Sequence, residues 1–191
     1  GLKKEHARKL EEVRRSAEKS YSITFGSVYL YPRTDGTNRA AMAFKNMLNI
    51  GFRGMWVAKR DVDEILSGRE SEKILSSVTV SRGRGDNKIS PTKLDFIAKK
   101  VNDFASGVTS EKNEGAALIE DLDVLFEANS PQRFRSFMKT LRSLADGKKV
   151  MILVDYEGDK LDDKTARWLT RSFRTMEAQD GSPKYAGRGG E

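Results

Sequence analysis

The chain has 191 residues, of which 37% are hydrophobic and 33% are charged, and it contains no cysteine. This length suits one domain with a sizeable core, and the lack of cysteine excludes disulfides, zinc–thiolate sites and thiol nucleophiles. Lysine and arginine number 35 against 28 aspartates and glutamates, a formal charge of +7 that favours an acidic partner such as nucleic acid, nucleotide or anionic lipid. No apolar run approaches the ~18 residues that span a bilayer, so we expect a cytoplasmic domain.

Residues 1–21 predict a charged helix or linker. Its only notable titratable group is His6, the single histidine of the chain, so no histidine-based catalytic or metal site is expected. The apolar stripe of this helix is thin, and acidic residues precede basic ones at the favourable i,i+4 spacing. The segment either docks on the domain or leaves an upstream part as a linker or short coiled coil. We favour the second, which would allow a membrane tether through an upstream segment.

Strands and helices alternate over residues 22–178, the expected domain. A short helix is expected near 62–66, and a flexible tail over 179–191. Ser90-Pro91 and Ser130-Pro131 each combine an N-cap residue with proline at the first helical position. The helix after Pro91 is expected to end before Gly107, with a polar loop over 108–114. The expected strands are 27–31, 54–59, 77–81, 116–119 and 150–154, and the main helices are 38–49, those after 90 and after 130, and one from about 163.

This alternation predicts an α/β fold, a mostly parallel sheet of about five strands with helices on both faces. The continuous apolar runs 116–119 and 150–154 suit strands that are buried on both faces. Right-handed crossovers then bring every strand-to-helix loop to one edge of the sheet, where ligands bind in such folds. The loops expected there are 32–37, 60–61, 81–90, 120–129 and 155–162.

The first of these loops is where a phosphate-binding loop would lie. That motif needs glycine, four residues, then Gly-Lys-Ser/Thr. Here Gly36 takes the second glycine position, but the other three are Tyr31, Thr37 and Asn38. The missing lysine removes the charge that meets the β and γ phosphates. A helix N-terminus can still attract an anion, with help from Arg33 or Arg39, although a plain turn explains the same residues.

Acidic residues follow the fourth and fifth expected strands, so several carboxylates converge at the same edge. They could bind a metal or nucleotide, or could serve as helix caps and ion-pair partners. No hydrolytic mechanism follows from them, because no lysine or histidine accompanies them. An atypical nucleotide site would use Gly36, Arg39, Glu120 and Asp123; Asp121 and Asp155 complete the acidic group. We assign no catalytic residue, metal or cofactor.

A basic, glycine-rich loop is the most unusual local sequence. Arg82, Arg84 and Lys88 lie on flexible backbone and could clamp phosphate, nucleic acid or an acidic protein surface. The alternative is a solvated loop. No aromatic residues are interleaved with the basic ones, so stacking on single strands is not supported.

The acidic stretch and its surroundings also carry a family resemblance. The relevant residues are Glu120–Leu125 after an apolar strand, Asn129-Ser130-Pro131 before a helix, the strand Val150–Val154, and Leu161-Asp162-Asp163. Over residues 27–176 the chain resembles the archaeal domain of unknown function, family 835. The resemblance implies a degenerate RecA/KaiC-like domain with an eroded phosphate loop and no established catalytic residues. Some members of that family follow membrane helices or lie beside signalling modules.

This chain departs from the family pattern at three positions. Glu120 replaces an aspartate, Asp121 a glycine and Asp123 a glutamate. We therefore expect a non-catalytic RecA-like regulatory or scaffold domain, a pseudo-ATPase that contacts a protein partner or forms a homo-oligomer. The alternatives are a nucleotide-responsive domain, and a nucleic-acid-binding domain that uses the 82–88 loop.

Overall fold

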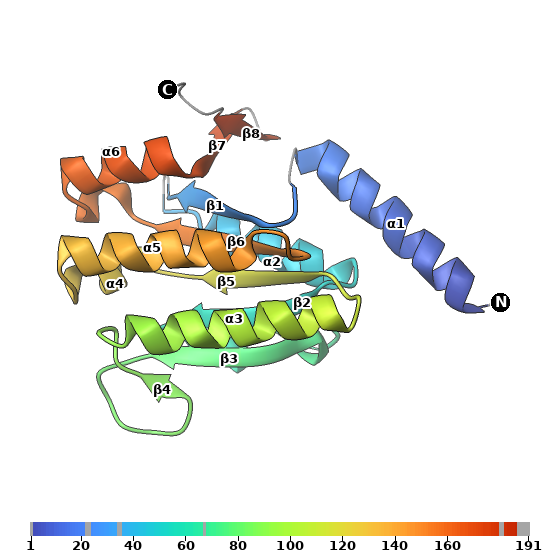
Figure 1. The fold of residues 1–191 in the computed structure, drawn as a ribbon, viewed down its shortest axis with the longest axis horizontal. Coiled ribbons are helices and arrows are strands. Elements are labelled where there is room, and N and C mark those ends of the chain that lie inside the picture. Colours follow the sequence, from blue (N-terminus) through green and yellow to red (C-terminus); the bar gives the residue numbers. More distant parts are fainter. Residues whose placement is uncertain (1, 22–23, 34–35, 67, 180–181, 187–191) are drawn as a thin grey trace.

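The computed structural model describes residues 2–21, 24–33, 36–66, 68–179 and 182–186. The expected turn at Thr34 and Asp35, and residues 180–181 and 187–191 of the expected tail, lie outside this part. Within the described residues, one sheet has the strand order β4-β3-β2-β5-β6-β1-β7-β8 (Figure 1). The strands are β1 (Ser27–Pro32), β2 (Arg53–Ala58), β3 (Ile74–Val80), β4 (Lys88–Ile89), β5 (Gly115–Ile119), β6 (Val150–Tyr156), β7 (Arg174–Gln179) and β8 (Ser182–Ala186).

The helices lie where the sequence periodicity placed them, with one addition. They are α1 (Leu2–Tyr21), α2 (Arg39–Asn49), α3 (Leu94–Ser110), α4 (Leu122–Glu127), α5 (Pro131–Ala145) and α6 (Asp163–Ser172), with 3-10 turns η1 (Val62–Glu64), η2 (Ser71–Lys73) and η3 (Gly158–Lys160). The added helix is α4, because 120–129 was expected to be a loop.

The predicted fold class is confirmed, since β1 to β7 are parallel and only β8 is antiparallel to its neighbour. The sheet is wider than the expected five strands. The two-residue β4 is too short to produce a hydropathy pattern. The strand β7 follows α6 so closely that the sequence pattern does not separate the strand from the helix. The strand β8 lies within 179–191, where the sequence indicated a flexible tail.

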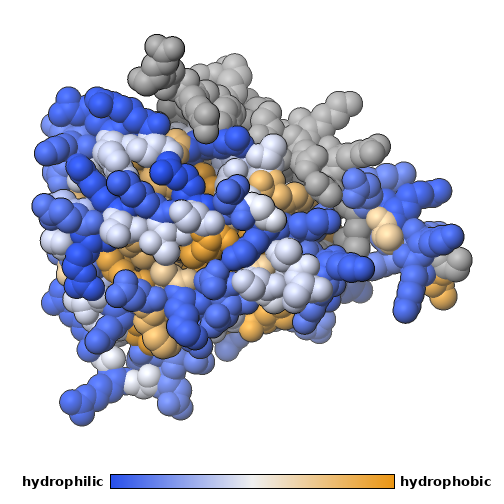
Figure 2. Space-filling view, viewed as in Figure 1, coloured by the Kyte–Doolittle hydropathy of each residue, from blue (hydrophilic) through white to orange (hydrophobic). Residues whose placement is uncertain are grey.

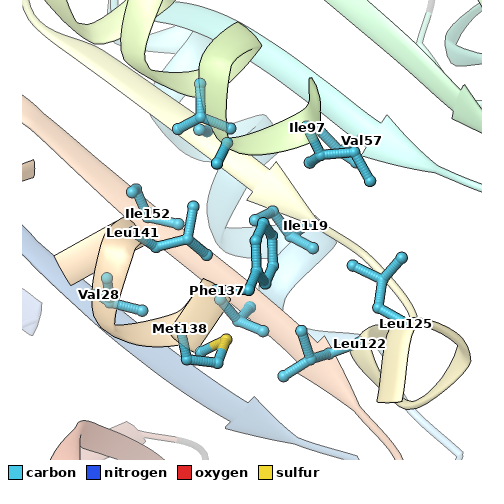
Figure 3. Close-up of a cluster of buried hydrophobic side chains, with 14 of the residues drawn as sticks. Val28, Val57, Ile97, Ile119, Leu122, Leu125, Phe137, Met138, Leu141 and Ile152 are labelled. Carbon is cyan, nitrogen blue, oxygen red and sulfur yellow. The ribbon is translucent and has the colours of Figure 1, made fainter. Parts of the chain in front are cut away.

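Helices cover both faces of the sheet. On one face, α2 packs over β2, β5 and β6, and on the other lie α3, α4 and α5. Alternate residues of each strand supply the two cores: Val28 and Leu30 face the α5 side, whereas Tyr29 and Tyr31 face the α2 side. Figure 3 shows the larger core, where Phe137 and Met138 of α5 meet Ile119 and Ile152 of the sheet. On the face shown in Figure 2, the outer surface over α3 and α5 is mostly hydrophilic.

The connections that follow β1 and β6 run in opposite directions across the sheet. The connection that leaves β1 passes through α2 on one face, and the connection that leaves the adjacent strand β6 passes through α6, whose Leu169 is buried in the core of the other face. The carboxyl ends of β1 and β6 therefore form a topological switch point, which is where ligands bind in open α/β sheets.

The starts of α5 and α2 agree with the sequence prediction, and the start of α3 differs from it. Ser130 caps α5 by accepting a hydrogen bond from the Arg133 amide, with Pro131 at the first position. Asn38 caps α2 in the same way through the Ala41 amide. The prediction that Ser90 caps α3 is wrong. Its hydroxyl contacts Thr92, and the helix begins after Lys93, which makes no side-chain cap.

The predicted end of α3 at Gly107 is also wrong. The helix continues to Ser110, because this extra turn places Val108 in the core with 1% of its surface exposed. Burial of such a side chain is worth about 1.5–3 kcal/mol, which exceeds the cost of about 1 kcal/mol for glycine inside a helix.

The N-terminal helix α1 leaves the body of the molecule at one side (Figure 1). Its described side chains, from Leu2 to Lys9, are exposed. None of the helices in the described part of the chain has both the length and the apolar character to cross a membrane.

Candidate functional site

Arg33 lies at the switch point between the carboxyl ends of β1 and β6. It follows β1 directly, and its Nε and Nη2 each lie 2.7 Å from the carboxylate of Asp155 on β6. Asp155 is fully buried and also accepts the backbone N–H of Asp121 at 3.0 Å. The hydrogen bonds to Asp155 raise the pKa of the Arg33 guanidinium above its usual value. The Arg33 guanidinium therefore stays charged throughout the physiological range.

A second arginine holds the neighbouring acid, Glu120, at the end of β5. Arg60 approaches with both Nε and Nη2, at 2.9 and 2.7 Å from its oxygens. Asn38, which caps α2, donates its amide to the same carboxylate at 2.7 Å. Only 1% of the Glu120 side chain is exposed. Three donors thus occupy a carboxylate that has about four acceptor positions.

Asp121 joins the two pairs in a backbone conformation that is rare for aspartate. Its φ of 56° and ψ of 52° are left-handed, a region that costs a non-glycine residue roughly 1–2 kcal/mol. Its side chain accepts from Nη2 of Arg33 at 3.1 Å. Burial raises the pKa of Asp121, although Lys59 and Arg33 oppose the shift.

Asp123 lies in the first turn of α4 and is 2% exposed. It accepts the amide of Glu157 at 3.2 Å, and Nζ of Lys160 lies 3.9 Å from it. Glu157 in turn pairs with Lys160 at 3.2 Å. Asp123 therefore fixes the loop after β6 to the start of α4.

Gly36 and Arg39, the other members of the predicted nucleotide site, lie at the same edge. Gly36 has a φ of 74° and is exposed. Arg39 turns away from the acids: its Nη2 donates to the carbonyl oxygens of Pro32 and Met176, at 3.1 and 2.9 Å. Its guanidinium lies 6.0 Å from the centre of the Tyr31 ring. Arg39 thus joins β1 to β7 and does not accompany Glu120.

The acids at this edge are therefore held by cations of the same chain. To coordinate magnesium or activate water, Glu120 or Asp155 would first have to lose a bidentate arginine. Removing one partner of a buried ion pair costs about 3–5 kcal/mol. This edge is built as a closed ion-pair network that joins β1, β5 and β6 to the loops after β1 and β2.

The basic loop lies apart from this network, at the β4 edge of the sheet (Figure 1). Arg82, Arg84 and Lys88 are exposed, which fits both an interaction loop and a solvated loop. Arg82 and Lys88 border a pocket of about 500 Å³ that also contains Lys59. The carboxylates of Asp61, Glu64 and Glu127 line the same pocket and balance these charges.

The sequence predicted that the carboxylates lie at one edge of the sheet, but it did not predict that arginines bind them. It named Arg33 only as an aid to anion binding, and it gave Arg60 no role. Arg33 is 122 residues from Asp155, and Arg60 is 60 residues from Glu120. The available signal was that loops 32–37 and 60–61, each with an arginine beside a strand end, had to meet the acids after the fourth and fifth strands.

A scan against models of protein families finds no match for this chain, and a search of curated proteins likewise finds none.

Proposed function

We propose that this chain is a non-catalytic RecA-like domain that acts through protein–protein contacts, in signalling or as a scaffold. The observation that carries the proposal is that Arg60 and Arg33 each bind one of the buried acids, Glu120 and Asp155 respectively, through two hydrogen bonds. These acids lie where an ATPase of this fold would need free carboxylates for magnesium and water. The resemblance to family 835 supports the same proposal.

The lysine position of the phosphate loop gives independent support. Thr37 is exposed and neutral, and the next residue, Asn38, uses its side chain to cap α2 and bind Glu120. Arg39 is committed to backbone carbonyl oxygens. Among the described residues around this loop, both Arg33 and Arg39 bind groups of this chain, which weakens the alternative of a nucleotide-responsive site.

Calorimetric titration with ATP and magnesium tests the non-catalytic part of this proposal. We expect no saturable heat and no change in melting temperature. Ligand at 100 times its Kd would stabilise the fold by about 2.7 kcal/mol, which is about 5–11 °C for a domain of this size. A rise of that order, or hydrolysis above the buffer rate, would show the proposal to be wrong.

Sedimentation velocity over a wide concentration range tests the protein-contact part. A homo-oligomer predicts a sedimentation coefficient that rises with protein concentration. Constant monomer behaviour would exclude self-association and leave a different protein as the partner.

Nucleic-acid binding is a second candidate, because Arg82, Arg84 and Lys88 are all exposed on one projecting loop. Binding through phosphates would weaken steeply with salt, and the change of all three residues to alanine would lower the slope of log K against log salt by about 3. The matched control changes Lys99, Lys112 and Lys139, three exposed lysines on other segments. Equal retention of DNA and RNA by both triple variants would exclude this function.

A further inference from the structure

The helices α5 and α6 and their caps carry more than half of the net positive charge of the chain. Residues 131–146 and 162–172 contain seven basic and three acidic residues, a surplus of four, against +7 for the whole chain. The basic residues are Arg133, Arg135, Lys139, Arg142, Lys164, Arg167 and Arg171. With the described residues of the chain, none of the seven forms an ion pair. The three acids lie at helix ends, so the middle of this surface holds only uncompensated cations.

Six of these cations form two rows on neighbouring helices. Residues 135, 139 and 142 follow one another along α5 at spacings of four and three, which places them on one side of the helix. Residues 164, 167 and 171 do the same along α6, at spacings of three and four. All six side chains are exposed except that of Arg135, which is half-buried. Each row spans seven residues, or about 10 Å.

Aromatic contacts between the helices fix the two arginines of the α5 row. Arg135 lies 5.4 Å from the ring centre of Trp168 in α6. Arg142 lies 5.1 Å from the ring centre of Phe173, which follows α6, and donates Nη1 to the carbonyl oxygen of Ser172 at 2.9 Å. The two helices therefore lie side by side, as Figure 1 shows. A guanidinium that is held against a ring loses less rotamer freedom when it binds an anion.

The other exposed side chains of this surface are short and polar. They are Gln132, Ser136, Thr140, Ser143 and Thr170. Together with arginine and lysine, serine, threonine and glutamine are the side chains that contact phosphate oxygens of nucleic acids. Of the large apolar side chains that are exposed in the described part of the chain, none lies on α5 or α6.

This composition discriminates among polyanionic partners. A protein interface needs an apolar core, and a helix that lies on a membrane inserts apolar side chains. A single nucleic-acid strand stacks its bases on exposed aromatic rings, whereas Trp168 is partly buried and carries Arg135 over its ring. The phosphates of a duplex require only cations and hydrogen-bond donors. The 15 residues of α5 extend for about 22 Å, which matches six or seven phosphates of one strand at about 3.4 Å each.

We propose that the outer surface of α5 and α6 binds the phosphate backbone of a nucleic-acid duplex without sequence preference. This site goes beyond the protein contacts proposed above and does not depend on them. It is also separate from the 82–88 loop, which lies at the β4 edge of the sheet, beyond α3 (Figure 1). Duplex DNA and duplex RNA present the same phosphate chemistry.

Fluorescence anisotropy of the complete chain with labelled duplexes of about 20 base pairs, one DNA and one RNA, tests this site. Six phosphate contacts predict a slope of log K against log salt of about −5. The triple change Lys164→Gln, Arg167→Gln and Arg171→Gln should reduce the size of this slope by about 3, and Lys139→Gln in the other row by about 1. The matched control removes three exposed charges elsewhere, through Lys4→Gln, Arg69→Gln and Lys112→Gln, and should leave the slope unchanged.

Each outcome decides the proposal. Binding that depends on both rows supports it, and a preference for one duplex identifies the nucleic acid. The proposal is wrong if neither duplex binds at 50 mM salt, or if the control lowers the slope as much as the α6 variant does at unchanged melting temperature. It is also wrong if only the change of Arg82, Arg84 and Lys88 weakens binding, which would assign the duplex to the 82–88 loop. Binding of phosphatidylserine vesicles through α5 and α6, without binding of either duplex, would make the partner a membrane and overturn the proposal.

Discussion

Replacing Arg33 by methionine tests whether the ion-pair network holds the carboxyl edge together. The change keeps much of the apolar stem of the side chain and removes the cation that Asp155 binds through two 2.7 Å hydrogen bonds. Asp155 is fully buried and would be left without its cationic partner. Loss of one partner of a buried pair costs about 3–5 kcal/mol. Arg33 is itself 19% exposed, so we expect a value near the lower limit, about 3 kcal/mol.

A double-mutant cycle with Asp155→Asn isolates the pair. Asparagine keeps an oxygen that can accept the Asp121 amide but removes the buried charge. The double variant carries neither charge of this pair, while Asp121 still loses Arg33, so it should recover part of the lost stability, with a coupling energy of at least about 2 kcal/mol. Urea unfolding with an unchanged m-value is the appropriate assay. A loss below about 1 kcal/mol for Arg33→Met, or a coupling energy near zero, would refute the reasoning.

Three further predictions concern substitutions at Asp121 and Ser130. Asp121→Gly should be more stable than Asp121→Ala by about 1 kcal/mol in chemical denaturation, because only glycine occupies the left-handed backbone without strain. Burial raises the pKa of Asp121, so the stability it contributes at low pH is lost as pH rises through that pKa. Asp121→Asn should accordingly gain stability relative to the parent chain as pH rises above about 4, the usual pKa of aspartate, and urea titrations that show a constant or opposite difference would contradict this. Ser130→Ala should lower the free energy of unfolding by about 1 kcal/mol through loss of the α5 cap, with Ser136→Ala in mid-helix as a control that retains this cap.

The spacing of apolar residues in the sequence predicted the helices and strands whose buried faces are formed by local patterns. In α5 the buried residues Phe134, Phe137, Met138 and Leu141 follow helical spacing, and β5 and residues 150–154 of β6 are continuous apolar runs that are buried throughout. Predictions were wrong where tertiary packing decided the boundary. The helix α3 continues past Gly107 because Val108 is buried in the core, and Ser90 cannot cap a helix whose first residue, Leu94, lies four residues further along the chain.

The partners in the acidic network could not be read from local sequence. Their identities depend on strand order, and the sequence pattern does not reveal that β6 lies between β1 and β5. That order places Asp155 beside Arg33 and within reach of the Asp121 amide. Asp121 adds a second difficulty, because an aspartate gives no sign of a left-handed backbone, whereas a glycine would have suggested one.

The network also determines what restoring the missing lysine would do. Thr37→Lys returns a cation to the position of the phosphate-loop lysine, next to Gly36, whose backbone has a positive φ. It does not release Glu120, which would still be held by Arg60 and by Asn38. We therefore expect calorimetry to detect no saturable ATP–magnesium binding for Thr37→Lys. The further change Arg60→Met removes the cation from Glu120 and leaves Asn38 as its partner, at a cost in stability that is below the range of about 3–5 kcal/mol for a buried pair, since Arg60 is 43% exposed. Saturable ATP binding by Thr37→Lys alone would mean that the lost lysine, and not the arginine-bound acids, is what closes this edge to nucleotides.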